Sequence, residues 1–306
     1  MRPYLVFNPG SRNGRAARVL DRCRAALEAA GRPYEIGRTE SLDDAARLAR
    51  GAVEQGLDPV VAVGGDGTIN RVLNGILRAG AERTDARLGV LYAGTSPDFC
   101  IYHGLPTSPE NAVAALLSGK ERPVDVCRIT MGNGSESPAV LHFASSANVG
   151  IGAAVARGAN RTRGVLGDAP GTLAAALAAI LRHRPRAMTV ITADGPIRLD
   201  RVWNVTVGKN PHIASGIRLG EGAAVPGGRL FVFAVHGVGR ARFLSALPGA
   251  YTGAIAADPR FLLTTARKVR LEAQGPPLEV EFDGDPAGHS PVEIEVLPDA
   301  VSLMGA

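Results

Sequence analysis

The stretch from Pro59 to Asn70, PVVAVGGDGTIN, decides how the first half of this chain is organised. Its first five residues form an apolar run typical of a buried strand, and the glycines that follow mark a tight turn. Apolar residues at helical spacing from Val72 to Leu77 predict a helix that begins at about Thr68. Amide groups at the start of a helix point toward an anion, and glycines let the backbone approach it closely. The stretch therefore predicts a strand-turn-helix unit suited to binding phosphate.

Asp66 lies inside this turn. A carboxylate repels a phosphate group, so phosphate binding requires Asp66 to hold Mg²⁺ or to accept a proton, as in phosphoryl transfer. Alternatively, GGDG is simply a tight turn between strand and helix in which Asp66 caps the helix. On these four residues alone both interpretations stay open.

Two other predicted strands end in polar loops that contain glycine. Residues 8–12 follow the strand 4–7, and Gly94 and Thr95 follow the strand 88–92. Because the carboxyl ends of parallel strands meet at one edge of a sheet, a single nucleotide could touch all three loops. Neither GxxxxGK[ST] nor GxGxxG occurs in the chain, which disfavours P-loop NTPases and ordinary dinucleotide-binding dehydrogenases.

The pattern of strands and helices changes at about residue 130. Before it, predicted strands at 4–7, 33–36, 59–63, 88–92 and 124–129 alternate with predicted helices at 15–30, 43–54, 68–79 and 109–118. This alternation predicts an α/β domain with a mostly parallel sheet. After it, strands are predicted at 140–145, 188–192, 197–207, 230–235, 269–272, 278–282, 292–296 and 301–304, with helices at 171–182 and 240–247. Asp194-Gly195 is a hairpin signal, so the second domain is predicted to be β-rich and antiparallel.

Composition excludes several classes of protein. The 306 residues include 34 Lys and Arg, 29 Asp and Glu, and 5% aromatic residues, so no nucleic-acid partner is expected. Cys23, Cys100 and Cys127 show neither metal-ligand spacing nor a disulfide framework. No apolar run is long enough for a membrane span, and the chain starts without a signal-peptide pattern. We expect a cytoplasmic protein.

Two arginine clusters are suited to anionic lipid headgroups. They are Arg157, Arg161 and Arg163, and Arg182, Arg184 and Arg186 with His183. Such clusters attract anionic membrane surfaces, although arginines in solvated loops are the common alternative. Peripheral contact with a membrane is therefore a hypothesis at this stage.

Several motifs, in order, run through nearly the whole chain. They are Asn8-Pro9-Gly10-Ser11, Thr39 with Asp44-Ala45, Gly64 to Asn70 continuing to Val72 and Asn74-Gly75, Gly94-Thr95 with Asp98-Phe99, Pro123-Val124-Asp125, Asn148 to Gly152, and Asp283-Gly284. Together they resemble the diacylglycerol kinase catalytic-domain family, especially the bacterial lipid kinases of the YegS type, which are related to sphingosine and ceramide kinases. GGDGT alone is shared with NAD kinases. The longer pattern GGDGTIN-x-V-x-NG, followed by GT-x-x-DF and a late DG, is characteristic of the lipid kinases.

The resemblance implies a fold and an organisation. It implies a Rossmann-like α/β domain over residues 1–129 and a β-rich, sandwich-like lipid-substrate domain over residues 130–291, with ATP in the cleft between them. The last strands, at about 292–306, are expected to return to the first domain.

The resemblance also implies site residues. Nucleotide contacts are expected from Asn8, Ser11, Arg12, Thr39, Gly64, Gly65, Asp66, Gly67, Thr68, Ile69, Asn70, Gly94 and Thr95. Asp285 stands where the family has a glutamate that serves as general base, and Asp66 is the second expected catalytic residue. Mg²⁺ is expected near Asp66, Asp98 and Asp125.

The chain departs from the family pattern at several positions. Pro97 stands where Asn is usual, Arg71 where Glu is common, and Asp285 is one methylene shorter than Glu. Ala214-Ser215-Gly216 replaces a usual glycine triplet. Gly227 occupies the place of an aspartate that holds a structural Mg²⁺ in bacterial members, so no metal is predicted there.

The sequence thus predicts an ATP- and Mg²⁺-dependent kinase that phosphorylates a hydroxyl group of a lipid, such as diacylglycerol or a sphingoid base, at a membrane surface. Whether it forms a homodimer stays open. Two alternatives remain. One is a kinase of a soluble hydroxyl compound such as NAD. The other is a nucleotide- or lipid-binding member whose catalysis is altered by Pro97, Arg71 and Asp285.

Overall fold

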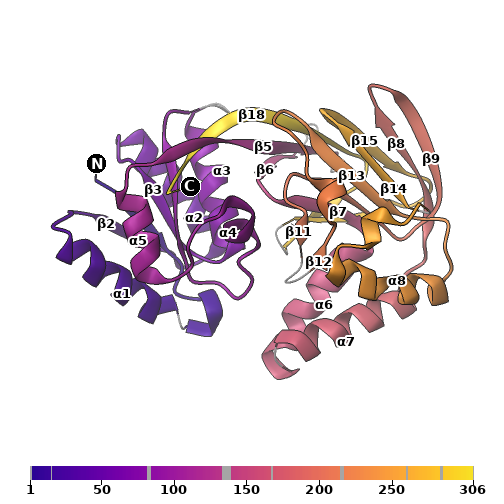
Figure 1. Ribbon diagram of the computed structural model, residues 1–306, viewed down its shortest axis with the longest axis horizontal. Coiled ribbons are helices and arrows are strands. Elements are labelled where there is room, and N and C mark those ends of the chain that lie inside the picture. Colours follow the sequence, from indigo (N-terminus) through magenta and orange to yellow (C-terminus); the bar gives the residue numbers. More distant parts are fainter. Residues whose placement is uncertain are drawn as a thin grey trace. The chain divides into compact units, whose positions relative to one another are not determined.

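The chain divides into two compact units (Figure 1). The computed structural model describes residues 2–14, 16–80, 84–132, 139–166, 168–213, 217–259, 261–282 and 285–305. The N-terminal unit comprises Met1–Val126 and Leu297–Ala306, and the C-terminal unit comprises Cys127–Val296. The sequence prediction divided the chain at residues 129/130 and at about 291/292. Two strands, β5 (Glu121–Met131) and β18 (Val292–Met304), contribute residues to both units.

The N-terminal unit contains a parallel sheet with the strand order β2-β1-β3-β4-β18. Its other strands are β1 (Tyr4–Phe7), β2 (Glu35–Arg38), β3 (Val60–Gly64) and β4 (Arg87–Tyr92). Its helices are the 3-10 turn η1 (Ser11–Gly14), α1 (Ala16–Ala29), α2 (Leu42–Glu54), α3 (Asp66–Ala79), α4 (Asp98–His103) and α5 (Pro109–Leu117). The predicted α/β architecture is confirmed.

Strand β3 shows why this sheet is covered on both faces. All five of its residues are buried. Val61 and Val63 belong to a core cluster with α1 and α5, while Val60 and Ala62 alternate to the face against which α2 and α3 pack. A parallel strand buried on both faces is a continuous apolar run, which is how it could be predicted from the sequence.

The C-terminal unit is built from two sheets. One has the order β14-β13-β10-β7-β16-β17, and its neighbouring strands are antiparallel. The other continues from β18 through β15 and β8 to β9, and β5 pairs with both β18 and β6. The strands are β6 (Ala139–Phe143), β7 (Ser146–Gly150), β8 (Arg186–Thr192), β9 (Gly195–Val202), β10 (Asn204–Gly208), β13 (Leu230–Val235), β14 (Leu262–Ala266), β15 (Lys268–Ala273), β16 (Glu279–Phe282) and β17 (Asp285–His289), with a separate short pair, β11 (His212–Ile213) and β12 (Ile217–Arg218).

Strand β13 shows how this unit is layered. Leu230, Val232 and Ala234 lie in a core cluster shared by the two sheets, as expected for a β-sandwich. Phe231 and Phe233 point to the opposite face, into a second cluster with helical residues. The helices and helical turns of this unit are α6 (Ile151–Leu166), α7 (Asp168–Arg182), α8 (Arg240–Thr252), η2 (Glu221–Ala223) and η3 (Ile255–Ala257). In the part of the chain that the structure describes, no helix is both long and apolar enough to cross a membrane.

Several predicted elements are wrong in detail. Helices α4 and α6 were not predicted. The expected strand 197–207 is two strands, β9 and β10, which are separated at Trp203. Conversely, the two strands expected at 292–296 and 301–304 form the single strand β18, which continues through Asp299 with a positive φ of 50°.

Candidate active site

The turn between β3 and α3 is formed by glycine backbone. Gly65 is the N-cap of α3 and makes no side-chain cap, and Asp66 is the first helical residue, so the alternative interpretation in which Asp66 caps the helix is wrong. The amides of Thr68 and Ile69 donate to the Gly65 carbonyl at 2.9 and 3.0 Å. The two amides before them, at the very start of α3, lie ahead of the first intrahelical bonds. They are available to an anion.

A second glycine loop packs directly against this turn. The amide of Ala93 donates to the Gly64 carbonyl at 2.8 Å, which joins the ends of β4 and β3. A Cβ atom on Gly94 would lie 2.5 Å from the Gly65 Cα and 2.5 Å from the Tyr92 hydroxyl oxygen. Only glycine fits where two backbones approach this closely. The structure thus brings the GGDGT and GT motifs together at one sheet edge.

Asn8 joins the loop after β1 to the same site. Its amide Nδ2 donates to Thr68 Oγ1 at 3.0 Å, and its backbone amide donates to the Val63 carbonyl at 3.1 Å. The Asn8 carbonyl accepts from the amide of Ser11 at 3.2 Å, which folds the polar loop back on itself. The side chain of Arg12 lies outside the described residues. Asn8 therefore borders the glycine turn, as the parallel-sheet argument predicted, and Ser11 lies in the loop that Asn8 joins to it.

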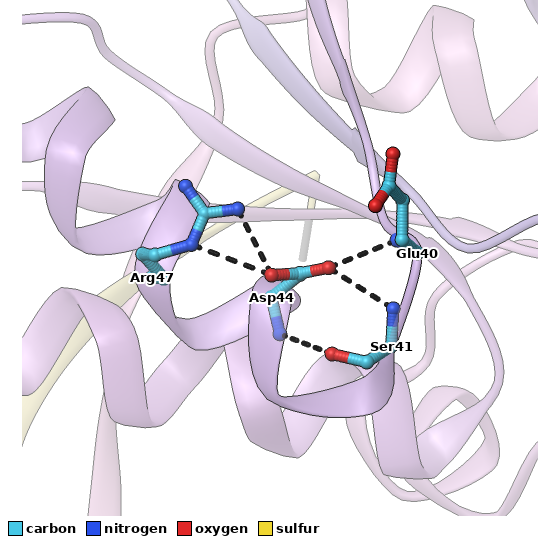
Figure 2. A network of polar contacts seen from close by, with 4 residues as sticks. All are labelled: Glu40, Ser41, Asp44 and Arg47. Atoms are coloured by element: carbon cyan, nitrogen blue, oxygen red, sulfur yellow. Dashed lines mark hydrogen bonds and ion pairs between the residues drawn. The ribbon is translucent and has the colours of Figure 1, made fainter.

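Thr39 follows β2 and is buried beside the same strand ends, with its amide donating to the Phe7 carbonyl at 2.9 Å. The next turn is fixed by Asp44 (Figure 2). Asp44 Oδ2 accepts from the amides of Glu40 and Ser41, both at 3.0 Å, and Oδ1 accepts from Arg47 Nη2 at 2.9 Å. The Arg47 bond, followed by these backbone bonds, lowers the pKa of Asp44 to about 2. Asp44 thus has a structural role at the start of α2.

The Asp66 carboxylate is the most unusual group at this edge. Its Oδ2 accepts a long hydrogen bond of 3.4 Å from the amide of Phe99, whereas its buried Oδ1 has no hydrogen-bond partner among the described residues. Burial, and then the neighbouring Asp98 carboxylate, raise the pKa of Asp66 to about 7. A buried carboxylate oxygen without a donor is costly, and a bound cation would remove that cost.

Asp98 and Asp125 differ in their surroundings. Asp98 is the first residue of α4, close enough to Asp66 to raise its pKa, and Ser96 Oγ donates to Asp98 Oδ2 at 2.9 Å. Asp125 lies on β5, where its Oδ1 accepts from the amide of Asp299 at 3.2 Å. Its carboxylate therefore bonds to β18 at Asp299, the residue with positive φ.

The three carboxylates expected near Mg²⁺ are consequently not united. Among the residues that the structure describes, no group of three or more His, Cys, Asp or Glu side chains is arranged to hold a metal ion. Mg²⁺, however, is usually held by one or two carboxylates together with water and substrate phosphates. Asp66, with its unpartnered buried oxygen, and the adjacent Asp98 fit that mode of binding.

Asp285 belongs to the C-terminal unit, whereas the residues above belong to the N-terminal unit. Its backbone opens β17 opposite Phe282, and its side chain, like Asp283 and Gly284, lies outside the described residues. Strand β17 is the antiparallel hairpin partner of β16. The role of Asp285 as a base stays a prediction.

Two departures from the family pattern have structural counterparts. Pro97 is the N-cap residue of α4, the helix that carries Asp98, and it makes no side-chain cap. Arg71, on α3, forms an ion pair with Asp43 of α2, with 3.8 Å between Nε and Oδ1. The segment 214–216, which replaces the usual glycine triplet, lies outside the described residues.

Sequence reasoning missed Lys209. Its side chain is buried in the C-terminal unit, and its Nζ donates to the carbonyls of Pro226 and Arg229 at 2.9 and 2.7 Å. These carbonyls flank Gly227, in the loop that resembles a structural metal site of the bacterial members. A weak signal existed, since Lys209 is one of three lysines in this arginine-rich chain and directly follows an apolar strand.

Two protein-family models match the chain. One describes the diacylglycerol kinase catalytic domain and matches residues 2–129. The other describes the YegS C-terminal NAD kinase beta sandwich-like domain and matches residues 145–305. Together they account for both structural units.

Similarities to whole proteins and to solved structures agree with these two family matches. A diacylglycerol kinase of Mycobacterium tuberculosis is 29% identical over 303 residues, which cover 98% of this chain and 93% of that protein. A probable lipid kinase YegS-like protein of Chromohalobacter salexigens is 38% identical over 120 residues, 37% of each chain. The crystal structure of a putative diacylglycerol kinase from Bacillus anthracis superposes with a TM-score of 0.79 at 21% identity, covering 99% of this chain and 94% of that one. Yeast NADH kinase gives 0.52 at 12% identity, covering 99% of this chain and 83% of that one, and shares the fold.

Proposed function

This chain belongs to the diacylglycerol kinase family that includes the YegS-type lipid kinases, and from that premise we propose that it transfers the γ-phosphoryl group of ATP to a lipid hydroxyl group. The acceptor we propose is diacylglycerol or a sphingoid base, and the reaction requires Mg²⁺. The relative of M. tuberculosis that matches nearly the full chain is named a diacylglycerol kinase, which supports this class of acceptor.

The observation that carries the proposal is the unpartnered Asp66 Oδ1 at the start of α3. Phosphoryl transfer needs positioned phosphates, a divalent cation that neutralises their charge, and little covalent chemistry from the protein. The glycine turn supplies amides for the phosphates, and Asp66 with Asp98 supplies carboxylates for the cation. Mg²⁺ bound there would offset the repulsion between these carboxylates and the phosphates. Burial and the neighbouring Asp98 raise the pKa of Asp66 to about 7, and a cation bound beside it would favour its charged form.

Each group then has a defined task. Gly65 and Gly94 let the two loops pack backbone against backbone, and this platform offers its amides to phosphate. Asn8 and Thr68 are bonded to each other and hold the first loop beside that platform. We assign to Asp285 the removal of the proton from the acceptor hydroxyl, which a carboxylate can do once it is within hydrogen-bond reach.

Substitution of the central carboxylate tests the proposal. Asp66→Asn keeps the size of the side chain but removes its charge, so we expect labelled phosphate transfer from ATP to a mixed lipid extract to fall at least about a hundredfold. Calorimetric titration with ATP should lose its Mg²⁺ dependence. The matched control is Asp21→Asn, an exposed carboxylate on α1 of the same unit, which should keep full activity. Full activity of Asp66→Asn would remove the central claim.

A second candidate function rests on Pro97 and Asp285. Pro97 has no amide hydrogen and stands directly before Asp98, and Asp285 is shorter than glutamate. These features favour a member that binds nucleotide or lipid with altered catalysis. The double variant Pro97→Asn/Asp285→Glu discriminates the two, because a dormant protein should gain turnover whereas an active enzyme should not need the changes. Offering NAD as acceptor in the same assay tests the soluble-acceptor alternative.

A further inference from the structure

Helix α7 carries a stripe of exposed leucines in the C-terminal unit. Leu173, Leu177 and Leu181 are spaced four residues apart and are 60%, 45% and 71% exposed. Residues 173–181 contain only Leu, Ala and Ile, so no polar side chain interrupts this face. Isolated exposed leucines are ordinary, but a continuous apolar row along a helix marks an interaction surface. We call these three residues the α7 stripe.

The opposite face of α7 is firmly packed, which fixes the direction of the stripe. Ala179 and Ile180 are buried in the core cluster that also holds Trp203 and Phe243. Gly158 of α6 lies so close to Ala175 that a Cβ atom there would be 2.9 Å from the Ala175 Cβ, and Thr162 Oγ1 donates to the Gly171 carbonyl at 2.7 Å. Since α7 is held from within by these contacts, rotation of the stripe into the core would break them.

The neighbouring helix α8 repeats the same feature. Its Phe243 stacks on Trp203 at 4.5 Å between ring centroids, while Leu244 and Tyr251 remain 39% and 59% exposed. Arg240, at the start of α8, donates to the carbonyls of Ile180 and His183 at 3.3 and 3.1 Å. The start of α8 is therefore joined to the end of α7, and both helices are seen along one margin of this unit in Figure 1.

The charged residues near the α7 stripe in sequence are almost all positive. Between residues 151 and 193 the sequence has six arginines and a single acidic residue, Asp168, and between residues 236 and 257 it has two arginines and no acidic residue. Arg182 and Arg184 are exposed directly after Leu181, Arg161 is exposed on α6 and Arg242 on α8. Arg157 differs, because it forms an ion pair with Glu279 of β16. In a chain with 29 acidic residues, this depletion of negative charge is strong.

An apolar helix face bordered by arginines matches the interface of an anionic bilayer. Leucine side chains enter the boundary between headgroups and acyl chains, while arginines remain at the level of the phosphates. A protein partner would need acidic side chains around an apolar groove, whereas an anionic bilayer provides both features over any area.

We propose that the α7 stripe, with Arg182 and Arg184 and the adjoining face of α8, docks this protein onto the surface of a membrane that contains anionic phospholipid. The proposal rests on the proposed function, because a lipid kinase must reach its acceptor at a bilayer. It goes beyond that function by assigning the contact to particular side chains of the C-terminal unit.

Vesicle binding without ATP or acceptor lipid tests the docking surface independently of catalysis. The probes are vesicles of phosphatidylcholine and phosphatidylglycerol in a two-to-one ratio, and vesicles of phosphatidylcholine alone, assayed by co-sedimentation with the full chain. We expect the wild type to bind the anionic vesicles more tightly. The triple variant Leu173→Ser/Leu177→Ser/Leu181→Ser should lower the partition coefficient about a hundredfold or more. Arg182→Gln/Arg184→Gln should lower it about fivefold per arginine at low salt, and less at high salt.

Matched controls come from the same unit. Val140→Ser removes an apolar side chain that is 41% exposed on β6, and Arg198→Gln/Arg267→Gln removes two exposed arginines elsewhere. Both should bind as the wild type does. All variants change exposed side chains, and circular dichroism with thermal unfolding verifies that they fold.

Three results would overturn the proposal. They are wild-type affinity of the triple leucine variant for anionic vesicles, equal binding of the wild type to both kinds of vesicle, and loss of self-association in the triple variant when the wild type binds no vesicles. The last result would assign the stripe to an interface between copies. Failure of the proposed function has a different signature, which is normal vesicle binding with no phosphate transfer to acceptors in detergent micelles.

Discussion

Two loops of this protein contain buried oxygen atoms that can accept hydrogen bonds. They differ in whether a donor bonds to these oxygens. In the N-terminal unit, the turn from β3 to α3 leaves Asp66 Oδ1 without a donor among the described residues. In the C-terminal unit, the carbonyls of Pro226 and Arg229 both accept from the buried Lys209 ammonium. An unpartnered buried acceptor costs stability and marks a place for a ligand, whereas acceptors filled by a side chain form a closed structural element. By this criterion the turn at Asp66, and not the loop at Lys209, is the candidate for ligand binding.

We expect the largest effect from a substitution that removes the Lys209 ammonium from the carbonyls of Pro226 and Arg229. Lys209→Met keeps a side chain of similar length but leaves two buried carbonyls without their charged donor, so we expect the free energy of unfolding to fall by about 4 kcal/mol. Urea unfolding measures it. Lys268→Met is the control, because Lys268 is half exposed in its ion pair with Glu293 and should contribute less than about 1 kcal/mol. A loss below about 1 kcal/mol for Lys209→Met would mean that the loop does not depend on its ammonium.

In the turn at Asp66, we expect a substitution to raise the free energy of unfolding instead of lowering it. Between pH 4 and 7 the folded chain keeps the Asp66 proton while the unfolded chain loses it, because the pKa of Asp66 is raised from 3.8 to about 7. The free energy of unfolding therefore falls as pH rises through this range. Asp66→Asn, without metal or nucleotide, should be more stable than the wild type by up to about 4 kcal/mol at pH 8 and by little at pH 4. A variant that is less stable at pH 8 would show that the hydrogen bonds to the Asp66 carboxylate outweigh the cost of burying its charge.

A third buried group, His103, combines features of the two loops, because only one of its ring nitrogens lies beside a donor among the described residues. Its Nδ1 is 2.8 Å from Arg122 Nη2, while its Nε2 is buried with no hydrogen-bond partner among the described residues. Burial, and then Arg122, lower the pKa of His103 from 6.5 to about 3. The folded chain keeps this imidazole neutral, so acidification below pH 6.5 favours the unfolded chain, which takes up the proton.

We expect this group to cost the wild type about 2 kcal/mol of stability between pH 8 and pH 5. His103→Leu should lose that part of the pH dependence in urea unfolding, whatever its stability at pH 8. His289→Leu, at an exposed position on β17, should keep the wild-type slope. Other groups titrate in the same range, but they are common to all three proteins. An unchanged slope in His103→Leu would show that the imidazole is accessible to protons in the folded chain.

How much of the fold could be predicted depends on whether the signal is local. The parallel strands of the N-terminal unit are buried on both faces, and their apolar runs identify them. Helix α6 was missed because glycines at 152, 158 and 164 weaken its local signal, yet Gly158 is what lets α7 approach. In β18, Pro298 and Asp299 indicate a break, but the strand continues, and Asp125 accepts the Asp299 amide from a position 174 residues away.

The residues of the candidate site also divide into those with a local sequence signal and those without one. The GGDGT, GT and Asn8 motifs are contiguous in sequence, so the glycines, Asn8 and Asp66 could be named, and the parallel sheet explains why they meet. The carboxylate of Asp125 serves β18, and no sequence pattern distinguishes that role from metal binding. Lys209 reaches carbonyls 17 and 20 residues away, and the α7 stripe is defined by which face of the helix packs. The rarity of lysine in this chain is only a weak signal for the first, and the exposed face of α7 is defined only once the chain is folded.

We expect the smallest effect at the starts of helices. Here too, some backbone groups are bonded by a side chain and others are not. Ser41 caps α2, and its Oγ accepts from the Asp44 amide at 3.3 Å, whereas Ser108 is the N-cap of α5 without a side-chain cap. Ser41→Ala should therefore cost about 1 kcal/mol, and Ser108→Ala a few tenths.

Urea unfolding of both variants, with hydrogen exchange at the first amides of α2 and α5, measures the difference. Equal costs would show that the capping bond of Ser41 contributes nothing net. A larger cost for Ser41 would support the interpretation of α3, whose N-cap is Gly65 and which has no side-chain cap. At α2 a side chain occupies one of the first amides, whereas at α3 the first amides stand beside a buried carboxylate without a side-chain cap, which is the arrangement that binding of a phosphate requires.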